Sequence, residues 1–445
     1  MAQAATQART MSNLERRYLE RTPKGAEVQA RAEKVMPGGE TRSLFFPPYP
    51  LTLDRGQGAR CWDVDDNEYM DLGNNYTVLI HGHRYPPIME AVAKQLEKGN
   101  TWAAKAVSQI ELAELLVERF EGMDKVRYSS TGTEAVLSVL AVARGYTGRR
   151  KILFSRYSFH GYLLEPSSRT YAPITAGEGA SGAVNDPYDN SGSWLDCYLA
   201  DFGDAESFER ILEEHGDEIC CVMLEPVLGL GGCVTAPKAF FERVKAAAHK
   251  AGALFILDEA TVHRISPGGA QKRIGVVPDV AILGKLVGGG FPNGTIAGAD
   301  EYMKVLNPRV GNTMVSGTFS GNPVSTTAGV QAITHFTDEA VARMERQMDR
   351  IEAGWTAAAK KNGLPFSTRR AGNLMNIFFQ DEPPPVCQLR TDQTFVDKFQ
   401  LACCVNGLFI VTRICINTSS VLTEADADEI IQRGERAMAD LANDL

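Results

Sequence analysis

The sequence predicts an α/β fold with a large domain, built on a mainly parallel sheet, and a smaller α+β domain. Short apolar runs alternate with amphipathic helical stretches through the middle of the chain. The runs are continuously apolar, which is typical of strands that are buried on both faces by helices. The length of 445 residues is sufficient for one large unit and a smaller partner.

Four apolar runs are expected to be buried strands: KILFS (151–155), CCVMLEP (220–226), ALFILDEA (253–260) and DVAILG (279–284). The stretches between them predict helices over 132–146, 204–216 and 237–252. The last of these begins at a proline and ends at a glycine, as helices commonly do. Ligands of such sheets collect at the carboxyl ends of the strands. Residues that follow each run are therefore candidates for a site.

The two ends of the chain predict the smaller domain. From about residue 325 a long helix is expected to lead into a short α+β segment, with a closing helix over 423–441. We expect the large domain at 81–324 and the smaller one at 325–445. The N-terminal segment 1–80 is expected to form part of the smaller domain. Residues 165–195 are rich in Gly, Ser, Pro and Asp and predict a long functional or mobile loop.

Charge and hydropathy exclude several classes of protein. A formal net charge of −9 argues against nucleic acid or an anionic membrane as a partner. No apolar run approaches the roughly 20 residues that span a bilayer, and the N-terminus lacks the apolar stretch of a secretory signal. The nine cysteines form no C-x-x-C pair. We therefore expect buried thiols, no metal site and a reducing, cytoplasmic location.

Three short stretches place polar or aromatic groups at strand ends and turns. STGTEA (130–135) offers hydroxyls and backbone N–H groups to a phosphate, or is a plain helix cap made by Thr131 or Thr133. LDEA (257–260) puts two carboxylates after an apolar strand, where burial raises a carboxyl pKa unless a cation or donor balances it. The aromatic ring of FHG (159–161) can stack on a flat ligand or pack in a core.

Lys285 lies between the apolar run AILG and the glycines 288–290. A partly desolvated lysine has a lowered pKa and attacks carbonyls as the free amine. A lone lysine at a strand end, however, is more often a residue that extends its amine to solvent. A phosphate cradle, a buried acid, an aromatic and this lysine together match pyridoxal phosphate, which carries a phosphate, a pyridine nitrogen and an aldehyde.

The motifs closely resemble those of class III (ω-type), fold-type I pyridoxal-phosphate aminotransferases. The resemblance runs from about residue 30 almost to the C-terminus, through PGGETRS, WDVDDNEYMDL, HGH, STGTEA, FHG, LEP, LDEA, PDVAILGKLVGGGFPNGTIAG and SGTFSGNP. It implies a seven-stranded sheet, the cofactor pyridoxal 5′-phosphate, and a homodimer with shared active sites. Within the class, the chain is most similar to the glutamate-1-semialdehyde aminomutase-like branch, and there to aromatic β-amino acid (β-phenylalanine) aminotransferases.

The resemblance assigns roles to individual residues. Lys285 is expected to be the Schiff-base lysine and proton shuttle, and Asp258 the acid that keeps the pyridinium nitrogen protonated. Further cofactor contacts are expected from the phosphate cup, the ring-facing residues, an acid near the 3-hydroxyl and a threonine of the neighbouring subunit: Ser130, Thr131, Gly132, Thr133, Phe159, His160, Ala260, Glu225 and Thr318. Ser130-Thr131 stands where Asn-Ser is commoner, and Ala260 where valine usually packs beneath the ring. Both departures could loosen cofactor packing.

Two arginines and an apolar wall are the expected substrate contacts. Arg42 matches an arginine that binds the substrate carboxylate, and Arg413 a second, mobile one that binds the carboxylate of 2-oxoglutarate or glutamate. One pocket must hold a carboxylate bidentately and accept an apolar group in the other half-reaction. The alternative for each arginine is a surface position. Tyr76 and LFF (44–46) are the expected apolar walls.

The leading hypothesis is an aminotransferase that moves the amino group of a β-amino acid or related amine to 2-oxoglutarate or pyruvate. The alternatives are an aminomutase, and a biosynthetic enzyme that uses the carbanion for decarboxylation or condensation, because the cofactor machinery is common to all three. A nucleotide-binding dehydrogenase is disfavoured, since neither GLGG (229–232) nor GGG (288–290) forms G-x-G-x-x-G. A non-catalytic relative would not need a strand-end lysine with a matching acid.

Overall fold

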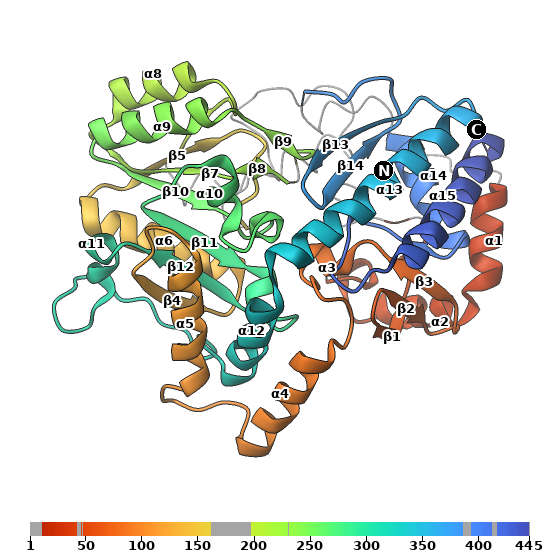
Figure 1. Ribbon diagram of the computed structural model, residues 1–445, viewed down its shortest axis with the longest axis horizontal. Helices are drawn as coiled ribbons and strands as arrows, with labels where there is room; N and C mark the ends of the chain where they lie inside the picture. The colour runs from red at the N-terminus through yellow and green to blue at the C-terminus, as the bar shows by residue number, and fades with distance from the viewer. Residues whose placement is uncertain are drawn as a thin grey trace, which may run out of the picture.

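The computed structural model describes residues 11–41, 46, 48–161, 197–229, 231–385, 393–411 and 416–444. Within them, a large sheet with its helices forms one part of the molecule, and the N- and C-terminal elements lie together on the other side (Figure 1). Short elements between the two parts are α3 (Asn74–Thr77), β8 (Val227–Leu228) and β9 (Val234–Thr235).

Seven strands form the large sheet: β4 (Lys125–Ser129), β5 (Lys151–Ser155), β6 (Cys197–Ala200), β7 (Ile219–Leu224), β10 (Leu254–Asp258), β11 (Val280–Gly284) and β12 (Gly294–Gly298). Their order is β4-β12-β11-β10-β7-β5-β6. The pairs from β11 to β6 are parallel, whereas β12 runs antiparallel to both neighbours. The predicted seven-stranded, mainly parallel sheet is confirmed, and the four apolar runs are strands within it.

Helices cover both faces of this sheet: α5 (Val107–Arg119), α6 (Gly132–Thr147), α8 (Ala205–His215), α9 (Lys238–Lys250), α11 (Asp300–Met303) and α12 (Pro323–His335). The helix α4 (Pro86–Lys98) packs on α12 instead, and the short helix α10 (Gly269–Ile274) lies between β10 and β11 in the sequence. Alternate residues of a strand point to opposite faces. Ile256 of β10 accordingly joins the core beneath α6, while Phe255 and Leu257 join the core beneath α8 and α9. In the described part of the chain, no helix is both long and apolar enough to cross a membrane.

The long helix expected from residue 325 is wrong, because two helices occupy this stretch: α12 and α13 (Asp338–Lys361). Phe336 and Thr337 have extended backbones between them. The Thr337 hydroxyl accepts a hydrogen bond from the backbone N–H of Ala340 at 3.2 Å, and two acidic residues follow in the first turn. This N-cap signal begins a new helix.

The smaller α+β unit contains α1 (Asn13–Arg21), α2 (Pro23–Ala32), β1 (Leu53–Gln57), β2 (Arg60–Asp63), β3 (Glu68–Asp71), α13, β13 (Ser367–Ala371), β14 (Leu374–Phe378), α14 (Gln393–Val405), β15 (Leu408–Phe409), β16 (Ile416–Asn417) and α15 (Glu424–Asp444). One apolar core joins residues from both ends of the chain, among them Leu14, Tyr69, Trp355 and Leu441. The expected unit of N- and C-terminal segments is therefore confirmed, while its boundaries at residues 80 and 325 stay a prediction.

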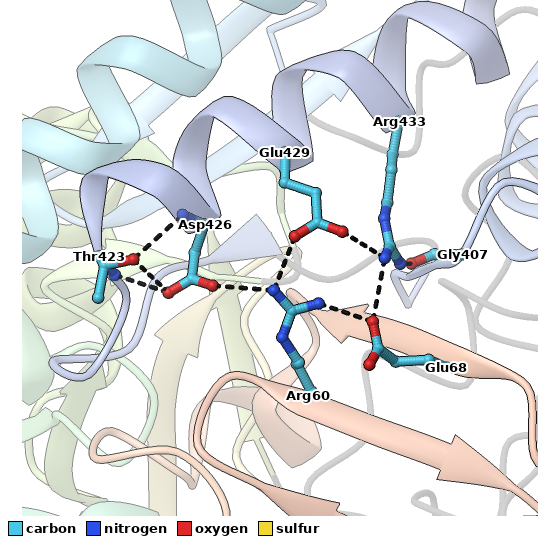
Figure 2. A network of polar contacts seen from close by, with 7 residues as sticks. All are labelled: Arg60, Glu68, Gly407, Thr423, Asp426, Glu429 and Arg433. Carbon is cyan, nitrogen blue, oxygen red and sulfur yellow. Dashed lines mark hydrogen bonds and ion pairs between the residues drawn. The ribbon is translucent and has the colours of Figure 1, made fainter.

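A polar network also connects the two ends of the chain (Figure 2). Arg60 of β2 contacts Glu68 of β3 at 2.7 Å and two acids of α15, Asp426 at 3.2 Å and Glu429 at 2.7 Å. Arg433 of α15 contacts Glu68 at 3.1 Å and Glu429. A single partly exposed ion pair contributes little, but charges shared in a network hold the helix against the β2–β3 hairpin in one orientation.

Close packing between α13 and α15 gives a test of this unit. Trp355 is fully buried and donates from Nε1 to the carbonyl of Ile430 at 3.3 Å. A β-carbon at Gly434 would lie 2.2 Å from that nitrogen. We expect Gly434→Ala to displace the indole and lower the free energy of unfolding by about 1–3 kcal/mol in denaturant titrations.

The matched control is Gly25→Ala in α2, where the nearest atom to a new β-carbon is 3.5 Å away. There the lower chain entropy of alanine should leave stability unchanged or raise it by about 0.4–1 kcal/mol. Equal effects of the two substitutions would contradict the packing argument.

Candidate active site

A cavity of about 390 Å³ opens at the carboxyl edge of the large sheet. That volume lies within the roughly 300–1,000 Å³ of small-molecule sites. Its lining comes from Asn75, Val78, Ser130, Thr131, Gly132, Thr133, Val136, Phe159, Gly161, Asp258, Ala260, Thr261, Gly284, Lys285, Gly290, Phe291, Pro292 and Asn293. Asp258 ends β10 and Lys285 directly follows β11, and the two strands are parallel neighbours. The topology thus brings the predicted acid and the predicted lysine into one cavity.

The backbone at Lys285 is held in an uncommon conformation. Its φ of +53° lies in the left-handed region, which residues with a side chain rarely adopt. Gly289 follows with φ +57°, and a β-carbon there would lie 2.5 Å from the carbonyl oxygen of Ala328 in α12. The glycines therefore let this turn pack against α12. The amine of Lys285 donates to the hydroxyl of Thr261 at 2.7 Å.

Asp258 is paired with a buried histidine. The Nδ1 atom of His160 is 2.9 Å from one carboxylate oxygen of Asp258, and the backbone N–H of Ala260 donates to the other at 3.0 Å. His160 is fully buried, and its Nε2 has no hydrogen-bond partner among the described residues. The pair fixes the orientation of the carboxylate that faces the cavity, so His160 acts on the cavity through Asp258.

Glu225 lies behind the cavity wall. It accepts backbone hydrogen bonds from Phe159 at 2.8 Å and Gly229 at 3.2 Å. Burial raises the pKa of Glu225 to about 7; the nearby His160 opposes this rise and the charge of Asp258 adds to it. The contact with Phe159 holds the FHG segment so that the Phe159 side chain reaches the cavity.

The second carboxylate of LDEA has a different role. Glu259 accepts from the backbone N–H groups of Ala270 at 2.5 Å and Gln271 at 3.0 Å, and it does not line the cavity. Burial raises its pKa to about 8. Glu259 therefore anchors the start of α10, while Asp258 alone serves the cavity.

The STGTEA segment is both a helix cap and part of the cavity wall, so the two interpretations of its sequence are compatible. Thr131 is the N-cap of α6, and its hydroxyl accepts from the backbone N–H of Glu134 at 3.2 Å. The same turn lines the cavity from Ser130 to Thr133. A β-carbon at Gly132 would meet no atom within 4 Å, so the backbone there is open to a ligand. Free N–H groups and the positive end of a helix favour a phosphate.

The residues present fit pyridoxal phosphate. The N-terminal end of α6 can hold the phosphate, the carboxylate of Asp258 can accept from a protonated ring nitrogen, and the amine of Lys285 can reach an aldehyde carbon. The ring of Phe159 provides an apolar face. Ala260 also lines the cavity, at the place where the resemblance expects valine.

Several predicted residues lie elsewhere. Thr318 is exposed and does not line the cavity of its own chain. Tyr76 is half-buried and is not part of the lining either, although Asn75 and Val78 beside it are. Of the LFF segment, Phe46 packs in the smaller unit, with its ring centroid 5.8 Å from that of Tyr18. Several other predicted residues lie outside the described part of the chain: Arg42, Leu44, Phe45, Arg413 and the whole of the 165–195 segment.

Several lining residues were not predicted from the sequence. Thr261 follows Asp258 by three positions in the same strand-end segment, a signal that could have found it. Asn75 lies in an unusual turn: Asn74, Asn75, Tyr76 and Thr77 all have positive φ, from +44° to +76°. Asparagine is among the few residues with a side chain that tolerate positive φ, so the pair Asn74-Asn75 could have indicated this turn from the sequence.

Cys61, Asp71 and His83, away from this cavity, bring possible metal-ligand atoms within 4.8 Å of one another. Their present contacts are those of a protein hydrogen-bond network. The Nε2 of His83 is 2.8 Å from Asp71, whose other oxygen accepts from the backbone N–H groups of Gly73 and Asn74, both at 2.8 Å. The expectation of no metal site stays a prediction.

Comparisons with known proteins agree with this site. The family model of class III aminotransferases matches residues 46–437. The glutamate-1-semialdehyde 2,1-aminomutase 1 of Bacillus cereus (strain G9842) is 36% identical over 362 residues, which are 79% of this chain and 82% of that protein. An omega-transaminase from Sphaerobacter thermophilus has a TM-score of 0.86 at 32% identity, over 95% of this chain and 99% of that one. A beta-phenylalanine aminotransferase from Variovorax paradoxus has a TM-score of 0.83 at 30% identity, over 94% of each chain.

The match spans both units of the fold, and one cavity is lined by the turn from Ser130 to Thr133, by Asp258 and by Lys285. The chain belongs to the class III aminotransferases, and it is an enzyme that depends on pyridoxal 5′-phosphate.

Proposed function

We propose that this enzyme is an aminotransferase that takes the amino group of a β-amino acid or related amine and passes it to 2-oxoglutarate or pyruvate. The two half-reactions would share one cavity in a ping-pong sequence. The observation that carries the proposal is the meeting of Lys285, Asp258 and the N-terminal end of α6 in that cavity. An amine, an acid and a phosphate site in one cavity are what amino transfer on this cofactor needs.

When bound, pyridoxal phosphate supplies an aldehyde that condenses with amines and a ring that withdraws electrons. Lys285 would hold the cofactor through its amine, and once released the same amine would take the proton from the carbon of the substrate. Asp258, oriented by His160, keeps a proton on the ring nitrogen. The turn from Ser130 to Thr133 holds the phosphate.

Two structural relatives favour a β-amino acid or related amine as the donor. They are the omega-transaminase and the beta-phenylalanine aminotransferase, which match nearly the whole chain at 32% and 30% identity. Val78, Phe159 and Phe291 give the cavity apolar surfaces that suit an aromatic or aliphatic side chain. Arg42 and Arg413 are our proposed carboxylate-binding residues, and Tyr76 a proposed neighbour of the substrate.

A second candidate is an aminomutase, which moves the amine within one substrate. It is favoured by the curated relatives, which are glutamate-1-semialdehyde 2,1-aminomutases at 36% and 37% identity. Decarboxylation or condensation through the same carbanion is the remaining alternative. All three reactions use the same groups at the carboxyl edge of the sheet. They can be separated by measuring how many amine molecules each site converts.

The decisive experiment supplies amines to the cofactor-loaded enzyme without any oxoacid. We expect β-phenylalanine to discharge the visible absorbance once per site and then stop, because the amino group stays on the cofactor. Adding 2-oxoglutarate or pyruvate should restore the absorbance. Sustained turnover of an amine without an oxoacid would instead favour the aminomutase and contradict an aminotransferase.

Lys285→Ala is the control for the residue assignment. Borohydride should fix the cofactor covalently on Lys285 of the wild-type chain, as mapped by peptide mass spectrometry, and should fix none on Lys285→Ala. Attachment at another lysine would exclude the proposed role of Lys285 while leaving the reaction class open.

We also propose that two chains share their sites in a homodimer. The loop that carries Thr318 exposes large apolar side chains: Val310 at 78%, Met314 at 91% and Phe319 at 60% of their surface. Contiguous exposed apolar residues are typical of a contact surface. A threonine from the partner chain would complete the phosphate site at the N-terminal end of α6.

A complementation experiment tests the shared site. Co-expressed Lys285→Ala and Thr318→Ala chains should form mixed dimers in which one of the two sites has both wild-type residues. We expect more activity from this mixture than from the sum of the two separate variants. A monomer in sedimentation, or activity equal to that sum, would contradict the shared site.

The pKa of Glu225 gives a pH prediction for the cofactor-free protein. Burial raises this pKa from 4.5 to about 7, so folding favours the protonated carboxyl. Its contribution to stability is fully present below pH 4.5 and is lost as the pH rises through 7. We expect the unfolding midpoint of the cofactor-free protein to decrease between pH 5 and 8.

Glu225→Gln removes this titration and keeps one acceptor oxygen for the backbone. The variant should have a lower midpoint at low pH, because one of the two backbone N–H groups of Phe159 and Gly229 loses its acceptor. Its midpoint should nevertheless decrease less with pH than that of the wild type. The same slope in both proteins would show that Glu225 does not titrate in this range.

A cytoplasmic location is proposed from the cysteines. The described cysteines at 61, 220, 221, 403 and 404 are free thiols, and all five are buried. Free thiols in this number are typical of a reducing compartment.

A further inference from the structure

Thr261 is placed to act on Lys285. It follows β10 by three residues and lines the cavity beside Asp258 and Ala260. The amine of Lys285 donates to its hydroxyl oxygen at 2.7 Å, across 24 residues of sequence. The contact joins the segments that follow two neighbouring parallel strands, so the register of β10 and β11 sets it.

The position of Thr261 is rigid. The turn after β10 is closed by backbone hydrogen bonds to the carbonyl of Glu259, from Val262 at 3.0 Å and from His263 at 2.9 Å. On the other side, a β-carbon at Gly229 would lie 3.1 Å from the methyl carbon of Thr261. The backbone of Gly229 is itself bonded to Glu225 at 3.2 Å. The hydroxyl therefore points at Lys285 from a turn whose backbone is fixed by hydrogen bonds, with Gly229 close to the methyl group.

The chemistry of the contact suits an amine that must act as a base. A free amine has two N–H bonds and one lone pair. When one N–H donates to Thr261, the directions that remain for the lone pair are restricted, and the amine stays close to the reacting atoms. A neutral oxygen also stabilises an ammonium less than a carboxylate does, so the amine can lose its proton more readily. His263, two residues after Thr261, is kept neutral because burial lowers its pKa to about 4.

We infer that Thr261 is a positioning residue: its hydroxyl holds the released amine of Lys285 at the cavity, in reach of the carbon from which the proton is taken. This inference rests on the proposed role of Lys285. The simpler alternative is that Thr261 only fills space between Gly229 and the turn after β10.

Three variants separate these possibilities. Thr261→Val keeps the shape and the methyl contact but has no hydroxyl, Thr261→Ser keeps the hydroxyl without the methyl, and Thr261→Ala has neither. If positioning depends on the hydroxyl, Thr261→Ser should behave as the wild type, while Thr261→Val and Thr261→Ala should be impaired in the same way. If only packing matters, valine should behave as the wild type and serine should not.

The first readout needs no cofactor. In the cofactor-free protein, the rate at which acetic anhydride modifies Lys285 is followed against pH by mass spectrometry. Loss of the acceptor destabilises the ammonium form of Lys285, so the pKa of Lys285 should be about 1 unit lower in Thr261→Val than in the wild type. A shift of this size corresponds to the lower end of the free energy that a hydrogen bond to a charged group contributes. Thr261→Ser should titrate as the wild type.

The second readout is the half-reaction with β-phenylalanine, or with whichever amine the wild type accepts. We expect Thr261→Val to slow the single-turnover rate by about 10- to 100-fold, which is at or below the low end of the roughly 10²–10⁴-fold that assisted proton transfer contributes, because Lys285 itself is kept. The isotope effect of a deuterated donor should increase, and the donor concentration at half-maximal rate should stay the same. Thr261→Ser should restore the rate.

Outcomes for Thr261 and for Lys285 can be told apart. If borohydride fixes the cofactor on Lys285 in every variant, but valine and alanine match the wild type in titration and rate, the inference about Thr261 is wrong and the proposed function stands. If the wild type carries the cofactor on another lysine, the proposed site fails whatever the variants do. Should Thr261→Val not fold, the comparison of Thr261→Ala with Thr261→Ser decides.

Discussion

The parallel pairing of β10 and β11 is the constraint on which the site depends. Both strands are buried along their whole length, so an unpaired charge in their interior is costly, and their carboxyl ends meet at the same edge of the sheet. Asp258 and Lys285 take these two ends, and each is contacted by a residue from a different segment of the chain. His160 orients the acid at 2.9 Å, and Thr261 contacts the amine at 2.7 Å. An acid and an amine can face one cavity there because the register of two apolar strands, rather than a flexible loop, sets their separation.

The smaller unit is coupled to this edge by a buried arginine. Arg264 is 1% exposed and donates to Asn373 at 2.8 Å, to the carbonyl of Thr77 at 3.2 Å, and to Asn417 and Thr418. These partners come from three separate parts of the chain, and a guanidinium has a rigid, planar set of donors. Breaking any one contact would leave a buried polar group unsatisfied, which costs about 1–3 kcal/mol. The arrangement of the two units is therefore specified at a point only a few residues from Asp258.

Much of the fold was predictable because its signals are local. Continuous apolar runs gave the central strands, and their ends led to Asp258 and Lys285. One long helix was predicted where α12 and α13 lie, because the apolar periodicity continues across Phe336. The N-cap Thr337, whose backbone is extended, separates the two helices. Thr261 was missed for another reason: its contact depends on the register between two strands, which the sequence does not display. Glu259 looked equivalent to Asp258, although the alternation of side chains along a strand already placed them on opposite sides.

Two segments whose backbones depart from local preference border the cavity. Lys285 has a left-handed backbone on one side of it, and the run from Asn74 to Thr77 has four such residues on another. Each non-glycine residue in that region costs about 1–2 kcal/mol, so these conformations need packing that leaves no alternative. For Lys285 that packing is α12 behind Gly289. The turn at 74–77 is held by the backbone carbonyl of Asn417, which accepts from the side chain of Asn74, and by the guanidinium of Arg264, which donates to the carbonyl of Thr77. The strain at the cavity thus depends on contacts from both units. Loosening either unit would disturb the position of Asn75 or Lys285 before it disturbed the cores.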